Sequence, residues 1–148
     1  MHARLSILMG GRAAEDVVLN EFSTGASDDL RKATGIARAM VTEYGMSEVV
    51  GPVHLVGERG SIFLGRDFGR TDDFSEETAR AVDGEVKRIL DAAYTLARTV
   101  LVDNRHILDN IAQVLLEKET LDGAAFEALV SSSNPVFPGG AASALSPA

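Results

Sequence analysis

The chain has 148 residues, 45% of them hydrophobic and 24% charged, which are ordinary values for one soluble globular domain. Its formal net charge is -8, and no cluster of Lys and Arg is present that could neutralise several phosphates, so we expect no nucleic-acid binding. The absence of cysteine excludes disulfides, thiolate catalysis and cysteine-ligated metals. Residues 5–9 form the longest apolar run near the N-terminus, far short of the roughly 20 residues that a membrane helix needs, so this chain should make no membrane contact.

Apolar residues recur at helical spacing from Leu5 to Val18, which predicts a first helix. Gly10 and Gly11 interrupt this pattern, at a cost of about 1 kcal/mol each relative to alanine. Such a pair favours the close approach of another backbone, so we interpret it as a packing feature and assign it no catalytic role. Residues 21–27 are predicted to form a connector.

Helical spacing resumes after the connector, with Ser27 as the predicted N-cap and Gly45 as the predicted stop. Between residues 46 and 73 the pattern changes to short apolar segments separated by glycines. We expect a loop there with one weak β-hairpin, formed by residues 53–56 and 62–64.

A long helix is predicted over residues 75–102, with Ser75 as its N-cap and an uninterrupted apolar stripe. Gly84 lies within it and predicts a local weakening or bend. Asp103 and Asn104 should end this helix and cap the next, which would give two antiparallel helices joined by a tight turn. The apolar face of that next helix is predicted to consist of Ile107, Leu108, Ile111, Val114 and Leu115.

Residues 120–122 are predicted to cap a last short helix that ends near Val130. From Ser131 onward Ser, Pro, Gly and Ala dominate without periodicity, so residues 131–148 are predicted to be a disordered tail. The fold class is therefore mostly α, a helical lobe over residues 1–130 with a minor β-hairpin or loop element.

Few signatures of self-contained catalysis are present. The only histidines are His2, His54 and His106, so the chain has neither an HExxH motif nor a histidine pair four residues apart that could bind zinc on one helical face. GxSxG and GxxxxGK[ST] are also absent, which argues against a serine nucleophile and against a nucleotide-binding loop. We assign none of the three histidines a role, and no catalytic residue is predicted within this chain.

Several collinear segments between Leu5 and Val130 resemble the peptidase domain of the FtsH-type ATP-dependent zinc metalloproteases. The segments are Gly10-Gly11-Arg12-Ala13-Ala14-Glu15, Ser23-Thr24-Gly25-Ala26-Ser27-Asp28-Asp29-Leu30, Tyr44-Gly45-Met46-Ser47, Phe63-Leu64-Gly65-Arg66, Ser75-Glu76-Glu77-Thr78-Ala79-Arg80 and Leu115-Leu116-Glu117-Lys118-Glu119. This resemblance implies the helical part of a zinc endopeptidase that degrades misfolded and membrane proteins. It also implies a membrane anchor, a peptidase on the cytoplasmic side, an ATP-binding AAA+ module outside this chain, and a homohexameric ring.

By resemblance to the family's Thr-Gly-Ala-x-Asn-Asp-Leu segment, Asp29 is the third zinc ligand, beside two histidines of an HExxH helix that this chain lacks. Asp28 stands where the family usually has Asn, so either carboxylate could be the ligand. Without the resemblance, Asp29 would simply be an acid in the first turn of a helix, where the helix dipole favours it.

One carboxylate cannot retain zinc, so the chain alone is predicted to be inactive. The alternative is a noncatalytic helical module for oligomerisation or partner binding.

Overall fold

The computed structural model describes residues 1–21, 23–55 and 75–138, and within them the chain forms five α-helices and no strand. The helices are α1 (His2–Leu19), α2 (Ser27–Thr42), α3 (Glu76–Asp103), α4 (Arg105–Lys118) and α5 (Gly123–Ser132). The predicted mostly α fold is confirmed. Of the predicted hairpin, residues 53–55 are not in a strand, and the remainder lies outside the described residues.

The first two helices differ locally from their predicted form. Helix α1 runs without interruption through Gly10 and Gly11, and a Cβ atom added at either glycine would meet nothing within 4 Å. No other backbone in the described part of the chain approaches the pair. The N-cap of α2 is Ala26, not Ser27, which is the first helical residue and makes no capping hydrogen bond.

Helix α2 ends at Thr42, three residues before the predicted stop Gly45, and Gly45 lies in the turn that follows. Its φ is +59°, in the left-handed region that side chains disfavour, and a Cβ there would lie 2.9 Å from the Cα of Pro52. Only glycine fits this turn without displacing the following loop.

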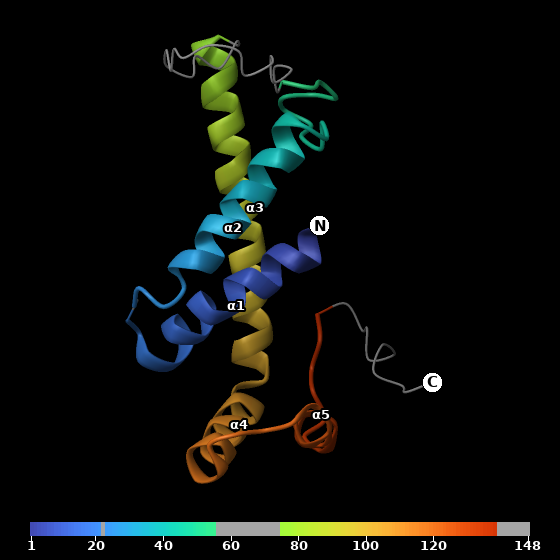
Figure 1. Cartoon of the computed structure of the whole chain (residues 1–148). Coiled ribbons are helices and arrows are strands. Elements are labelled where there is room, and N and C mark those ends of the chain that lie inside the picture. Colours follow the sequence, from blue (N-terminus) through green and yellow to red (C-terminus); the bar gives the residue numbers. More distant parts are fainter. Residues whose placement is uncertain (22, 56–74, 139–148) are drawn as a thin grey trace, which may run out of the picture.

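Helix α3 is the longest element and organises the fold (Figure 1). Ser75 caps it, because its hydroxyl accepts a hydrogen bond from the amide of Thr78 at 3.2 Å. The helix spans 28 residues, or about 42 Å, and is continuous through Gly84.

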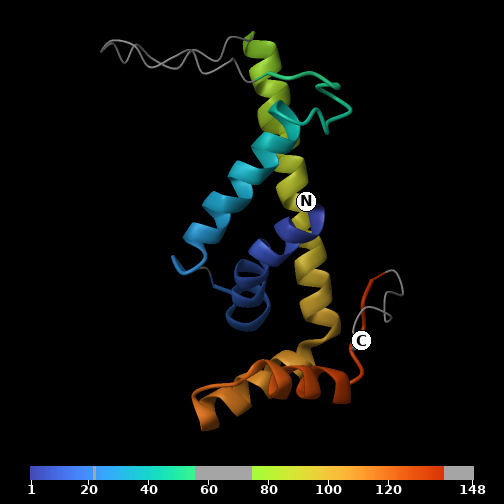
Figure 2. The same ribbon diagram turned by 45° about the vertical axis from the view of Figure 1, so that its right-hand side comes forward.

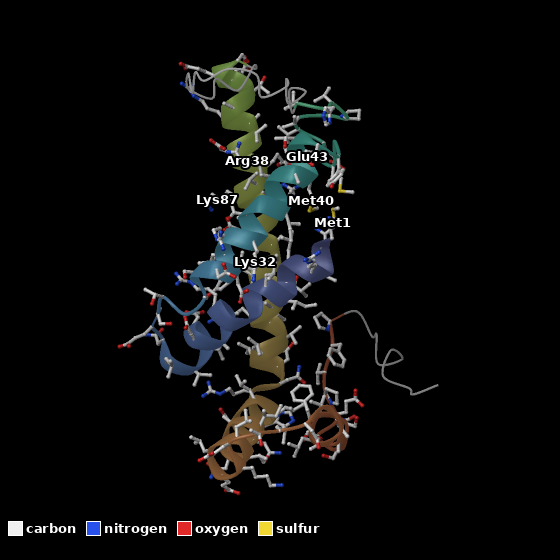
Figure 3. The ribbon with its side chains drawn as sticks, viewed as in Figure 1. Met1, Lys32, Arg38, Met40, Glu43 and Lys87 are labelled. Atoms are coloured by element: carbon white, nitrogen blue, oxygen red, sulfur yellow. The ribbon has the colours of Figure 1, made fainter. Side chains whose placement is uncertain are left out.

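Helices α1 and α2 both pack along α3, and all three meet in one hydrophobic core (Figures 1 and 2). Alanines at the helix contacts allow close approach, while longer side chains fill the space between them. The buried core residues are Leu5, Met9, Ala13, Ala33, Ala37, Met40, Val41, Val82, Val86, Ile89, Ala93 and Ala97. In Figure 3, Lys32 and Arg38 project from α2 at its surface, whereas Met40 of the same helix is fully buried.

A buried polar contact joins the loop after α2 to α3. The hydroxyl of Ser47 donates to the carboxylate of Glu85 at 2.8 Å and accepts from the amide of Val50 at 3.1 Å. Arg88 also donates to the Glu85 carboxylate, through Nε at 2.8 Å and through Nη2 at 3.0 Å. Both Ser47 and Glu85 are 4% exposed. These bonds lower the pKa of Glu85, chiefly through Arg88 and then through Ser47, so the carboxylate stays ionised despite its burial.

The predicted antiparallel pairing of α3 with α4 is wrong. Helix α4 turns away from the lower end of α3 and lies beside α5 instead (Figure 2). Asn104 does separate α3 from α4, but its side chain does not cap α4. Its amide donates to the carbonyls of Val100 and Val136, and its side-chain oxygen accepts from the amide of Val136 at 2.7 Å.

These bonds bring the segment after α5 back to the α3–α4 junction. Helix α5 itself starts as predicted, with the Asp122 carboxylate accepting from the amide of Ala125 at 2.7 Å, and it ends at Ser132, two residues beyond Val130. Residues 133–138 follow it in described positions, and the rest of the predicted tail, residues 139–148, lies outside the described residues.

Of the five predicted apolar positions of α4, only Ile107 is buried. Within the described ranges, no helix has both the length and the apolar character needed to span a bilayer.

Candidate functional site

Asp29 lies in the first turn of α2, directly after the connector from α1. Its side chain is half-buried, and within the described part of the chain its carboxylate has no hydrogen bond or ion pair. Its oxygens therefore remain available to an added ligand. The helix N-terminus at this position favours a negative charge.

Asp28, the other candidate, is occupied by neighbours on its own helix. It forms ion pairs with Arg31 and, at 2.6 Å, with Lys32. Hydrogen bonds from Lys32 and then Arg31 lower the pKa of Asp28 to about 2. A metal ion at Asp28 would have to displace both cations, so the local contacts favour Asp29 over Asp28 as a ligand.

Glu15 of α1 holds the connector that leads into this turn. Its carboxylate accepts a hydrogen bond from the Ser23 hydroxyl and another from the Ser23 amide at 3.2 Å. The Ser23 hydroxyl in turn accepts from the amide of Gly25 at 3.0 Å. A Cβ at Gly25 would lie 3.1 Å from that hydroxyl oxygen, which leaves little room for a side chain. The bonds from Ser23 also lower the pKa of Glu15, so the anchor is ionised at neutral pH.

The last turn of α1 is itself held by the neighbouring helices. The Asp16 carboxylate accepts from Arg98 of α3 at 2.8 Å, and hydrogen bonding from Arg98 and then Tyr94 lowers the pKa of Asp16. Arg105, at the start of α4, donates to the carbonyl of Val17 at 2.8 Å. The turn that carries Glu15 is thus fixed from two helices.

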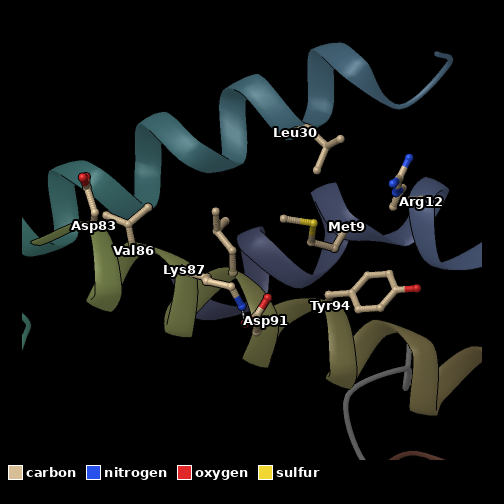
Figure 4. Close-up of a pocket in the computed structure, with 9 residues that line it drawn as sticks. Met9, Arg12, Leu30, Asp83, Val86, Lys87, Asp91 and Tyr94 are labelled. Atoms are coloured by element: carbon tan, nitrogen blue, oxygen red, sulfur yellow. Dashed lines mark hydrogen bonds and ion pairs between the residues drawn. The ribbon is translucent and has the colours of Figure 1, made fainter. Parts of the chain in front are cut away.

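A groove lies between α1, α2 and α3 (Figure 4), and Leu30, the residue after Asp29, is one of its lining residues. Its volume is about 470 Å³, and Leu30 and Met9 face each other across it with Tyr94 and Arg12 at one end. The remaining lining residues are Asp83, Val86, Lys87, Leu90 and Asp91.

Two of the histidines have ordinary local partners. A ring nitrogen of His54 lies 3.1 Å from the carbonyl of Glu43, and one of His106 lies 3.1 Å from that of Ser133. Across residues 1–21, 23–55 and 75–138, no three His, Cys, Asp or Glu side chains are grouped so as to hold a metal ion.

The sequence indicated Asp29 but did not indicate the residues that fix its position. Glu15 belongs to the motif that begins at Gly10, which we interpret from the sequence as a packing feature. Its position eight residues before Ser23 could have indicated a hydrogen bond to the connector. Asp16 and Arg98 are separated by 82 residues, and no local pattern indicates that pairing.

Comparisons with known proteins identify the family of this chain. Residues 1–129 match peptidase family M41. ATP-dependent zinc metalloprotease FtsH 4 of Sorangium cellulosum is 50% identical over 129 residues, which cover 86% of this chain and 20% of that protein. FtsH 1 of Thermoanaerobacter sp. is 52% identical over 120 residues (81% and 20%), and FtsH of Mycobacterium leprae is 48% identical over 132 residues (89% and 17%). The chain therefore spans about a fifth of the length of the curated relatives that it matches, and it belongs to peptidase family M41.

Proposed function

We propose that this chain is part of the peptidase domain of an ATP-dependent zinc endopeptidase and that Asp29 is one of its zinc ligands. The observation that carries the proposal is the contrast between two adjacent carboxylates: Asp28 is paired with two cations, while Asp29 has no such partner among the described residues. The names of the relatives support the zinc and ATP dependence of the whole protein.

The donor chemistry of Asp29 fits a catalytic zinc site. Such a site has three protein ligands from His, Asp or Glu and keeps its fourth position open. Zinc bound there would lower the pKa of a coordinated water to about 7 and make it a nucleophile toward a peptide carbonyl. Asp29 would supply one anionic oxygen, and two histidines outside this chain would complete the set.

The proposal extends to the assembly by the resemblance described above. The longer protein would bind ATP in a separate module, form a homohexameric ring, and be anchored in a membrane with the peptidase on the cytoplasmic side. Its substrates would be misfolded and membrane polypeptides.

The test compares Asp29→Asn with Asp28→Asn in the longer gene product that contains this chain. We expect Asp29→Asn to lower bound zinc and casein hydrolysis together, because a neutral amide replaces an anionic ligand. Asp28→Asn should retain both the bound zinc and the casein hydrolysis, because it removes only surface ion pairs. Loss of zinc in the Asp28 variant with retention in the Asp29 variant would move the ligand by one position.

The isolated 148-residue chain provides the second arm. After dialysis it should hold no stoichiometric zinc and should not cleave casein. Tight zinc binding at one ion per chain would contradict the proposal. An upstream reading frame without an HExxH motif would favour the noncatalytic helical module.

A further inference from the structure

We infer that Arg98 of α3 is a positioning residue for the candidate ligand Asp29, acting through Asp16 and the last turn of α1. The inference rests on the zinc role proposed for Asp29. Three successive contacts support it: α3 with α1, α1 with the connector, and the connector with α2.

The first contact is between α3 and α1. Arg98 Nε lies 2.8 Å from Asp16 Oδ2. The Asp16 side chain is only 20% exposed, so water screens this pair less than it screens the pairs on the outer surface of α2. A donor on α3, a helix of the hydrophobic core, therefore fixes the position of Asp16.

The second contact is between α1 and the connector. Consecutive residues of a helix point about 100° apart, so Asp16 can face α3 while Glu15 faces the connector. The carboxylate of Glu15 accepts two hydrogen bonds from Ser23, one from its amide and one from its hydroxyl. Any shift of this helical turn would displace Glu15 and Ser23 together.

The third contact is between the connector and α2. The amide of Ser27 donates to the carbonyl of Thr24 at 3.1 Å, and the amide of Leu30 donates to the carbonyl of Ala26 at 3.0 Å. These hydrogen bonds restrict the backbone between Ser23 and Asp29. A metal ligand must be held within about 0.5 Å of its productive position, and Asp29 makes no side-chain bond in the described part of the chain that would hold it directly. Its placement therefore depends on the packing of α2 and, at the N-terminal end of that helix, on this backbone path.

An ion pair that only stabilised the fold would behave differently, and the chain offers a matched control. Arg38 of α2 bonds Asp83 of α3 at 2.9 Å, so this pair also joins two helices. Its arginine is exposed to a similar extent, 48% against 52% for Arg98, but it lies toward the other end of α2 from Asp29. The carboxylates differ, since Asp83 is 68% exposed and Asp16 only 20%, so the effect of each variant on the connector amides is compared with its effect on global unfolding.

The first measurement uses amide hydrogen exchange in the 148-residue chain, at a temperature well below each variant's melting point. Arg98→Ala should accelerate exchange at Gly25 and Ser27 about tenfold, whereas Arg38→Ala should leave both amides within twofold of the unsubstituted chain. Arg98→Lys, which keeps a cation, should restore part of the protection.

The second measurement is zinc affinity in the longer protein, by competition with a chelator. Arg98→Ala should raise the zinc dissociation constant roughly tenfold, the lower end of what loss of an outer partner of a metal ligand causes, with Arg38→Ala within twofold. Equal behaviour of the two variants in both measurements would overturn the inference. If Asp29→Asn retained zinc, the proposed function would fail; if it lost zinc while Arg98→Ala bound normally, only the positioning role would fail.

Discussion

Ser47→Ala tests the buried polar contact between α3 and the loop after α2. Truncation removes one hydrogen bond to the Glu85 carboxylate and the acceptor of the Val50 amide. A hydrogen bond to a charged group contributes about 1.5–3 kcal/mol, and the half-buried amide adds to this, so we expect the free energy of unfolding to fall by about 2–3 kcal/mol. For a chain of this size that corresponds to a decrease in melting temperature of roughly 4–10 °C.

The measurement is urea and thermal unfolding followed by far-UV circular dichroism. Ser27→Ala is the matched control, because Ser27 is exposed, lies at the start of α2 and makes no capping bond. It should change the unfolding free energy by less than about 0.5 kcal/mol. Equal losses in the two variants would refute the reasoning, because they would show that burial of the Ser47 bond adds nothing.

The pH dependence gives an independent check on the same contact. The pKa of Glu85 is lowered from 4.5 in the folded chain, so the unfolded chain takes up the proton first on acidification. The stabilisation is therefore complete above about pH 5 and is lost as the pH falls from 4.5 toward the folded pKa. The stability difference between the unsubstituted chain and Glu85→Gln should shrink over that interval. A difference that stayed constant down to pH 3 would contradict the assigned pKa direction.

Three further outcomes follow from other contacts. Leu5→Ala, at a fully buried position, should destabilise the chain by about 3–4 kcal/mol in urea unfolding. Gly45→Ala should destabilise because it combines a positive φ with a close backbone contact, whereas Gly11→Ala should stabilise the isolated chain by up to about 1 kcal/mol because its helical site is open; equal effects in thermal unfolding would contradict both assignments. Lys32→Ala should raise the pKa of Asp28 from about 2 toward its ordinary value, because it removes the strongest bond to that carboxylate, and carboxyl-carbon NMR titration would measure this.

Local patterns predicted the helices well wherever the cause was local. The apolar stripe of α3 and the capping hydroxyl of Ser75 lie within one element, and both are present as predicted. The direction of α4 was not predictable in this way. Asn104 at the α3–α4 junction bonds Val136, which lies 32 positions away, and no local pattern indicates that contact.

The candidate site likewise combines features that local sequence indicates with features that it does not. Resemblance of one short segment indicated Asp29, but the choice between Asp28 and Asp29 depends on which side chains pair along the surface of α2. Helix α1 runs unbroken through Gly10 and Gly11, because the packing of Leu5, Met9 and Ala13 in the core offsets the predicted cost of the two glycines. Helix propensity predicts little at a glycine pair when the residues before and after the pair are buried on the same face of the helix.

The junction at Asn104 separates regions of very different burial. Helix α5 has no buried residue and α4 has only Ile107, while α1 to α3 hold the hydrophobic core. Local opening free energies follow buried apolar contact, so the α4–α5 pair should unfold as a separate unit while the three-helix core stays intact. In native-state exchange its amides would then lose protection at denaturant concentrations that leave Met40 and Val86 protected, and a proteolytic cut after Asn104 would leave α1, α2 and α3 packed together.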